Sequence, residues 1–221
     1  WQGRRLLVSA GPTREWFDPA RCITNPSSGR MGVLLAQAAR LRGAEVDLVH
    51  GPLQLEPAWL DGLHCHPIET GAELQASLEA LQPSADAIAM AAAVADHRPK
   101  QRSNHKPDKQ DLAVAMEAGW EPIPDVLRGL VERRPAGQGI LGFAAHTGDV
   151  LPQAQAKWAR KGCDLLFANP IDAPGAGFGG LTNEGWILGP GEVVQRVEPM
   201  GKLALAHRLL TALAASSGGH G

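Results

Sequence analysis

Short apolar runs alternate with helix-forming segments along most of the chain. Residues 6–10 are apolar and end at a Gly-Pro pair, which is typical of a buried parallel strand that leads into a loop. Residues 31–42 are rich in helix formers, and Gly43 is a stop signal before the apolar run 45–49. This order of strand, helix and strand predicts a βαβ unit.

The same alternation continues toward the end of the chain. Thr70, followed three residues later by Glu73, predicts a capped helix to about residue 81. The pattern also predicts strands at 63–68, 85–91, 139–143 and 164–168, helices at 124–132, 153–161 and 202–214, and a hairpin formed by 187–188 and 193–197. The predicted fold is α/β: a Rossmann-like, doubly wound, mostly parallel sheet with helices on both faces and a small terminal β-hairpin. We expect a single domain over residues 1–215 and a flexible tail over 216–221.

Two polar segments interrupt this rhythm. Residues 11–32 join the first strand to the first helix and are rich in Gly, Ser, Asn and Arg. Residues 95–111 are basic, contain proline and show no periodicity. Both are longer than a crossover connection needs, so we predict two functional loops, the second of them a flap.

Composition and charge narrow the function classes. The chain has 44% hydrophobic and 20% charged residues, as an ordinary globular protein does. Its net charge of −2 argues against general nucleic-acid binding, whereas a small anion needs only a local basic cluster. Cys22, Cys65 and Cys163 form no close pair, which suits packing roles in a reducing cytosol.

The chain shows no signal for a membrane or for secretion. No apolar stretch reaches the roughly 20 residues that span a bilayer, and the N-terminus lacks a signal-peptide pattern. We therefore expect a cytoplasmic protein with no membrane partner. A start at Trp1 without an initiator Met is expected of one domain of a longer polypeptide.

Ligands of a doubly wound sheet bind outside the carboxyl ends of its strands, which makes the first polar segment a candidate site. Ser27, Ser28 and Gly29 precede the first helix and can offer N–H groups and hydroxyls to an anion, and Gly32 allows close approach. An ordinary helix N-cap explains the two serines equally well. Asn25 is a candidate for stabilising developing negative charge, although a lone loop Asn is more often a turn residue.

The second polar segment carries five cations that can clamp a triphosphate: Arg98, Lys100, Arg102, Lys106 and Lys109. Asp96 is a candidate for a sugar hydroxyl or a metal ion. The alternative, a solvated surface run, is favoured by composition alone.

A third region follows the strand predicted at 139–143. Phe143 is a candidate for stacking on a nucleobase, although a core role is the commoner one. His146 is a weak candidate for an acid or base. Lys157 and Lys161 lie one helical turn apart and share a face.

Several familiar chemistries are excluded or disfavoured. The chain contains no Gly-x-x-x-x-Gly-Lys-Ser/Thr, no His-Glu-x-x-His, no Gly-x-Ser-x-Gly and no Tyr, and its opening loop lacks Gly-x-Gly-x-x-Gly. A phosphate site without an obvious nucleophile indicates activation and transfer on a bound nucleotide. The alternatives are a Rossmann-type NAD(P)-dependent oxidoreductase and a non-catalytic nucleotide-binding module.

Seven ordered blocks carry a specific resemblance over nearly the whole chain. They are SAGPTRE (9–15), DPAR (18–21), ITNPSSGRMG (23–32), AAVAD (92–96), PDVL (124–127), GFAAHT (142–147) and KGCDLLFAN (161–169). With these blocks the chain resembles phosphopantothenate–cysteine ligase, the synthetase half of the bifunctional coenzyme A biosynthesis protein of bacteria. The flavin-dependent decarboxylase half, to which the domain is fused in that protein, is absent from this chain.

The resemblance implies a two-step ligation with CTP and Mg²⁺ in a homodimer. Phosphopantothenate and CTP would give an acyl-cytidylate and pyrophosphate, and cysteine would then displace CMP. The implied catalytic residues are Asn25 and Lys106. The implied CTP site comprises Met90, Ala91, Ala92, Asp96, Lys106, Pro124, Asp125, Val126, Leu127, Phe143, Lys157 and Lys161, and the implied phosphopantothenate and phosphate site comprises Gly11, Asn25, Ser27, Ser28, Gly29, Met31 and Gly32. The resemblance implies no particular metal ligands.

The chain departs from the family pattern at three places. Residues 122–125 read Pro-Ile-Pro-Asp where the family often has Lys-Asn-Pro-Asp, and His146 replaces the usual Glu. The segment around Lys106 aligns poorly, so Lys109 is the alternative for its role.

Overall fold

An eight-stranded sheet forms the centre of the molecule in the computed structural model, which describes residues 1–172, 179–191 and 193–216. Its strand order is β12-β11-β10-β9-β6-β1-β4-β5. The strands are β1 (Arg5–Ala10), β4 (Glu45–His50), β5 (His64–Pro67), β6 (Ala87–Met90), β9 (Gly139–His146), β10 (Leu165–Pro170), β11 (Thr182–Gly189) and β12 (Val193–Gly201). All neighbours from β10 to β5 pair in parallel, whereas β11 and β12 run antiparallel, so the predicted fold class is confirmed.

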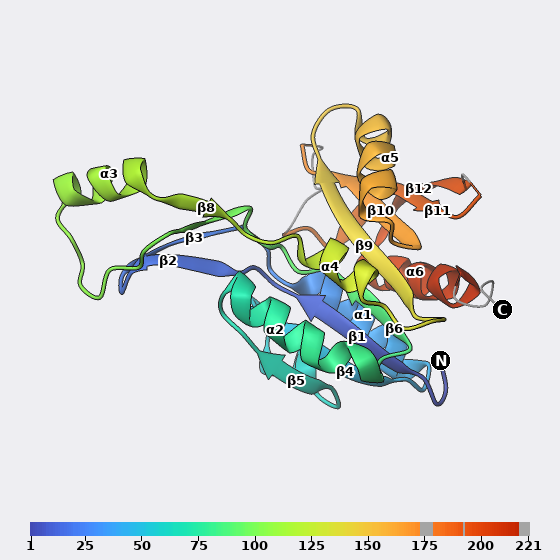
Figure 1. The fold of residues 1–221 in the computed structure, drawn as a ribbon. Coiled ribbons are helices and arrows are strands. Elements are labelled where there is room, and N and C mark those ends of the chain that lie inside the picture. Colours follow the sequence, from blue (N-terminus) through green and yellow to red (C-terminus); the bar gives the residue numbers. More distant parts are fainter. Residues whose placement is uncertain (173–178, 192, 217–221) are drawn as a thin grey trace.

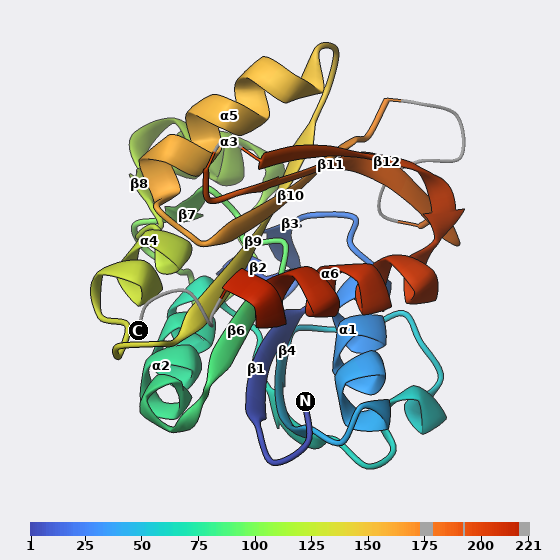
Figure 2. The same ribbon diagram turned by 90° about the vertical axis from the view of Figure 1, so that its right-hand side faces the viewer.

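Helices cover both faces of this sheet (Figures 1 and 2). Helices α1 (Arg30–Leu41) and α6 (Lys202–Ser216) share one hydrophobic core, and α2 (Gly71–Leu81), α4 (Val126–Glu132) and α5 (Val150–Lys161) share the other. Successive side chains of β1 alternate between these cores, with Leu6 and Val8 in the first and Leu7 in the second. Two short 3₁₀ turns, Pro57–Leu60 and Gln82–Ser84, complete the connections.

Both polar segments contain regular structure that the sequence did not predict. The first holds the hairpin β2 (Arg14–Asp18) and β3 (Arg21–Thr24). The second leads through β7 (His97–Pro99) to α3 (Lys109–Ala118) and β8 (Trp120–Pro122), and β7 pairs with β8. We call residues 14–24 and 97–122 the arm, which projects from the sheet in Figure 1. The prediction of irregular loops is wrong here because strands of three to five residues are too short to show periodicity.

One aromatic pair joins the two parts of the arm. The rings of Phe17, on β2, and Trp120, on β8, meet edge to face with centroids 5.1 Å apart. At the tip, Asp108 caps α3 by accepting hydrogen bonds from Gln110 N (2.9 Å) and Asp111 N (3.0 Å). This packing explains how a polar stretch keeps a defined shape.

These elements confirm some local predictions and extend others. The capping box of Thr70 and Glu73 is confirmed at the start of α2. The terminal hairpin is longer than predicted and extends the main sheet as β11 and β12. Helix α6 continues through Ser216, the first residue of the predicted tail, and 217–221 lie outside the described residues.

The cysteines and the helices were expected to show packing roles and no membrane-spanning segment, respectively. All three cysteines are free. Burial raises the pKa of Cys163 to about 11, which keeps this thiol neutral and suits a packing role. Among the helices of the described residues, none has the length and apolar character needed to cross a membrane.

Candidate active site

A cavity of about 460 Å³ opens at the carboxyl ends of the central parallel strands. Its walls come from the loop before α1, the residues after β6, the start of α4, the ends of β9 and β10, and α5. Open α/β sheets bind ligands at this edge, and the sequence predicted a site there.

The cavity brings together nearly all the residues that the sequence singled out. Its lining includes Asn25, Ser27, Ser28, Gly29, Met31, Gly32, Met90, Ala91, Ala92, Asp96, Pro124, Asp125, Val126, Leu127, Phe143, Lys157 and Lys161. Gly11 and Lys106 are not part of that lining. Sequence reasoning missed Arg30, Asn169, Asn183 and Lys202, together with several apolar neighbours.

The start of α1 forms an open anion cradle. The N-cap residue is Gly29, in the left-handed conformation (φ 78°), and no side chain caps it. Ser27 Oγ accepts from Gly29 N (3.3 Å) and Ser28 Oγ accepts from Arg30 N (3.4 Å). Neither serine is the N-cap residue, but both hydroxyls accept from N–H groups at the helix start, so the capping alternative is confirmed in part. Arg30 N already donates to Ser28 Oγ, but the first-turn N–H groups of Met31 and Gly32 have no intrahelical acceptors, so this helix start is able to bind an anion.

Gly32 allows α1 to lie directly against the end of β1. A Cβ atom on Gly32 would lie 2.7 Å from Ser9 O and 2.6 Å from Ala10 Cβ. Gly11 lies behind the cradle, where its Cα would be 3.3 Å from a Cβ on Gly29. These glycines set the distance between helix and sheet that shapes the cradle.

Asn25 connects the first polar segment to the second. Its Nδ2 donates hydrogen bonds to the carbonyl oxygens of Ala93 (3.2 Å) and Val94 (3.1 Å). Its own carbonyl oxygen accepts from Ser27 N (2.8 Å), so Asn25 is also a turn residue. The side chain is thus fixed at the cavity wall between the cradle and the residues that follow β6.

Two lysines of α5 supply positive charge to the opposite wall. Lys157 Nζ donates to Phe143 O (3.2 Å), and Lys161 forms an ion pair with Asp125, the residue that caps α4. Burial lowers the pKa of Lys157, and the charges of Lys161 and Arg160 lower it further. This wall is therefore suited to an anionic ligand.

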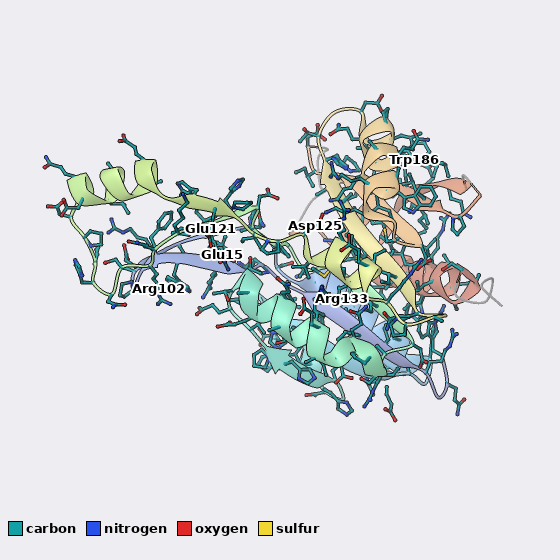
Figure 3. The ribbon with its side chains drawn as sticks, viewed as in Figure 1. Glu15, Arg102, Glu121, Asp125, Arg133 and Trp186 are labelled. Atoms are coloured by element: carbon teal, nitrogen blue, oxygen red, sulfur yellow. The ribbon has the colours of Figure 1, made fainter. Side chains whose placement is uncertain are left out.

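Asp125 is ionised at neutral pH in this setting. Burial alone would raise its pKa, but hydrogen bonds from Lys161 and from Arg128 N, with nearby positive charge, lower it overall. Figure 3 shows Asp125 beside the sheet, apart from Arg102 and Glu121 on the arm.

The ring of Phe143 serves both the core and the cavity. It packs edge to face on Phe167, with centroids 5.8 Å apart, and its residue is half-buried at the cavity wall. The core role is confirmed, while stacking on a nucleobase stays a prediction.

The basic cluster of the second segment does not line the cavity. Arg98 pairs with Glu121 on the arm (2.6 Å), and the guanidinium of Arg102 lies over the Trp16 ring. Lys106 precedes α3 in the connection at the far end of the arm (Figure 1). Its contact with a nucleotide stays a prediction.

His146 ends β9 outside the cavity lining, and burial and the Lys157 charge lower its pKa although Gln153 opposes this. Among the described residues, no group of three His, Cys, Asp or Glu side chains is placed to hold a metal ion. Asp96 is one carboxylate in the cavity lining that can contribute to a Mg²⁺ site shared with phosphates.

Known proteins resemble this chain over its whole described length. Residues 1–216 match the family model "DNA/pantothenate metabolism flavoprotein C-terminal domain". The coenzyme A biosynthesis bifunctional protein CoaBC of Bacillus subtilis (strain 168) is 37% identical over 217 residues, which cover 98% of this chain and 52% of that protein. CoaBC of Mycobacterium tuberculosis (strain H37Rv) is 38% identical over 230 residues, covering 96% and 52%.

A solved structure agrees with these relatives. The C-terminal domain of a CoaBC protein superposes with a TM-score of 0.77 at 32% identity, covering 95% of this chain and 93% of that one. The chain thus spans about half the length of the curated relatives it matches. The resemblance inferred from the sequence blocks is confirmed, and the chain belongs to the DNA/pantothenate metabolism flavoprotein C-terminal domain family.

Proposed function

We propose that this domain is a phosphopantothenate–cysteine ligase of coenzyme A biosynthesis. It joins 4′-phosphopantothenate to L-cysteine at the expense of CTP and releases CMP and pyrophosphate. The observation that carries the proposal is the single cavity that combines the open start of α1, Asn25 and the lysine pair of α5. The names of the curated relatives support the same pathway.

The proposed reaction has two steps. A carboxylate oxygen of phosphopantothenate attacks the α-phosphorus of CTP, and the bond from that phosphorus to the β-bridging oxygen breaks, so pyrophosphate leaves. The amine of cysteine then attacks the acyl carbon, loses a proton as the amide forms, and displaces CMP. Both steps build up negative charge on phosphate oxygens.

The cavity supplies what such a reaction needs from a protein. The N–H groups at the start of α1 and the amines of Lys157 and Lys161 stabilise phosphate charge. The fixed amide of Asn25 holds the two substrates' reacting groups in position. No side-chain nucleophile is required.

Mg²⁺, the homodimer and Lys106 complete the proposal. Asp96 would help to hold Mg²⁺, which would neutralise part of the triphosphate charge. We assign the arm as the dimer contact, because it projects from the sheet and consists largely of two short two-stranded ribbons. Lys106 meets a triphosphate only when the arm bends toward the cavity or a partner subunit supplies it. The reaction would take place in the cytoplasm, where the three free cysteines stay reduced.

The decisive experiment is a nucleotide-dependence assay. The domain is incubated with phosphopantothenate, cysteine, Mg²⁺ and either CTP or ATP, and CMP or AMP, pyrophosphate and the amide product are quantified. We expect CMP, pyrophosphate and product in equal amounts. Without cysteine, pyrophosphate release should stop after about one equivalent per site.

Three outcomes contradict the proposal. Turnover with ATP alone overturns the assignment of CTP. Tight CTP binding without turnover, with every substrate present, identifies a non-catalytic nucleotide-binding module. A saturable NAD(P)H fluorescence change without ligase activity identifies an oxidoreductase.

A further inference from the structure

The cavity has a second pair of cations that neither the resemblance nor the sequence motifs assigned. Arg30 and Lys202 both line it, and each is the first residue of its helix, α1 and α6. These helices share the core on one face of the sheet, whereas Lys157 and Lys161 reach the cavity from α5 on the other face. The cavity therefore receives positive charge from helices on both faces of the sheet.

Lys202 is a buried cation that lies close to a second cation. The residue is 3% exposed, and its backbone N–H donates a hydrogen bond to Leu181 O (3.0 Å). Burial lowers the pKa of its side chain, and the positive charge of Arg30 lowers it further. An anion bound between these two cations would be attracted by both of them.

Helix dipoles add to this arrangement. The start of a helix carries partial positive charge and favours acidic side chains. Neither α1 nor α6 has an acidic residue in its first turn, and both begin with a cation. Two helix starts and two cations thus all favour an anionic ligand at this end of the cavity.

Among the described residues, the groups that orient the Arg30 side chain carry no full negative charge. Its Nη1 donates to the carbonyl oxygen of Gly179 (3.2 Å), and its guanidinium lies over the Trp59 ring at 5.9 Å. A carbonyl and an aromatic face orient the guanidinium without supplying a full negative charge. The Arg30 side chain is therefore preorganised for a ligand that carries a full negative charge.

We propose that Arg30 and Lys202 form an anion subsite that holds the terminal phosphates of the nucleotide and then the pyrophosphate product. The inference rests on the proposed function. The part of the cavity formed by Pro124, Asp125 and Val126 at the start of α4 offers apolar and polar atoms suited to a nucleoside. A triphosphate that extends from there across the cradle of α1 brings its β- and γ-phosphates to Arg30 and Lys202.

The subsite has a defined chemical role in the first step. As the carboxylate attacks the α-phosphorus, the bridging oxygen keeps the electron pair of the broken bond, and the negative charge of pyrophosphate increases. Cations fixed beside that leaving group stabilise the transition state more than the bound substrate. Arg30 and Lys202 are thus proposed to assist departure of pyrophosphate.

The test combines truncation of the ligand with truncation of the side chain. Binding of CTP, CDP, CMP, inorganic pyrophosphate and phosphopantothenate is measured by calorimetry for the wild type, Lys202→Met and Arg30→Gln. The matched control is Arg208→Gln, which removes a cation from α6 whose guanidinium contacts Arg196 O rather than the cavity. Thermal melting of each variant verifies that it is folded.

We expect both variants to weaken binding of CTP and pyrophosphate by about 10- to 100-fold, as loss of a charge-assisted hydrogen bond does. Binding of CMP and phosphopantothenate should match the wild type, and so should every affinity of the control. Lys202→Arg keeps the charge and should retain most of the CTP affinity; it and Arg30→Gln carry the test if Lys202→Met does not fold.

Equal losses for CTP and CMP would overturn the subsite, because they indicate a nucleoside contact or a structural effect. Unchanged pyrophosphate binding would overturn it as well, as would a loss confined to phosphopantothenate. The proposed function fails separately: if the wild type uses only ATP, the series ATP, ADP and AMP tests the same subsite. Pyrophosphate binding that depends on Lys202 supports the subsite even if no ligase activity is found.

Discussion

The side-chain amide of Asn25 donates a hydrogen bond to the carbonyl oxygen of Ala93, with 3.2 Å between Nδ2 and O. This contact joins two segments that lie 68 residues apart in the chain, and both segments line the cavity. The position of the wall beside the α1 cradle therefore depends on the N–H donors of this amide.

Asn25→Asp is expected to impair the ligase at its first step. The carboxylate cannot donate to Ala93 O or Val94 O and brings negative charge toward phosphate oxygens. We expect pyrophosphate release in single turnover to slow by about 10²- to 10³-fold, as removal of one stabilising donor does. The free energy of unfolding should fall by only about 1 kcal/mol in urea titrations.

Gln155→Glu is the matched control, because it adds the same charge on the exposed side of α5. Normal turnover of Asn25→Asp would show that this side chain has no part in the chemistry.

Lys106→Gln should reduce kcat/KM for CTP more than Lys109→Gln. Lys109 is held as the first residue of α3, whereas Lys106 lies in the connection before that helix and is exposed. A lysine in the irregular connection can follow the arm onto a triphosphate, and its loss should cost about tenfold or more. Steady-state kinetics of the two variants provide the comparison, and the opposite ranking assigns the role to Lys109.

Gly32→Ala should separate the helix from the sheet at the cradle. The added Cβ would lie 2.7 Å from Ser9 O, which is closer than van der Waals contact permits. We expect a loss of about 1–3 kcal/mol in the free energy of unfolding, with weaker binding of CTP.

The matched control for this variant is Gly201→Ala, where a Cβ would meet nothing within 4 Å. Equal stability of both variants in urea would mean that α1 has room to move away from β1.

His146 should make the protein less stable in weak acid. Burial and the Lys157 charge lower its pKa below the ordinary 6.5, so below that pH the unfolded chain binds the proton more readily. Its contribution to stability is therefore complete above pH 6.5 and is lost as the pH falls through the folded-state pKa.

The measurement is the free energy of unfolding between pH 7 and pH 5. We expect wild-type stability to decline more steeply than that of His146→Gln, while His105→Gln, at an exposed position, follows the wild type. Parallel curves for the wild type and His146→Gln would exclude this histidine as the source.

Elements with a strong hydrophobic or capping pattern were predictable from the sequence. The apolar runs of β1 and β10 lie in the centre of the sheet, where burial on both faces makes a strand continuously apolar. The capping box of α2 is purely local, so Thr70 and Glu73 sufficed to predict it. The placement of site residues at strand ends followed from the topology.

The arm and the second cation pair could not be predicted in the same way. Strands β7 and β8 pair across an intervening helix, and their short sequences carry no alternation. Lys202 enters the cavity because α6 returns across the sheet to α1, a tertiary contact that no local pattern encodes. Arg30 lies within the ITNPSSGRMG block, but its position in the sequence alone predicts no role for it.

The cavity is bordered by helices from both faces of the sheet, and this has a consequence for unfolding. A bound ligand would contact α1 and α6 in one core and α4 and α5 in the other, so it would tie together two layers that the sheet keeps apart. Its binding energy would then add to the stability of both layers at once. Above the dissociation constant, each tenfold increase in free ligand would raise that stability by about 1.4 kcal/mol, and amide exchange would slow on either side of the sheet.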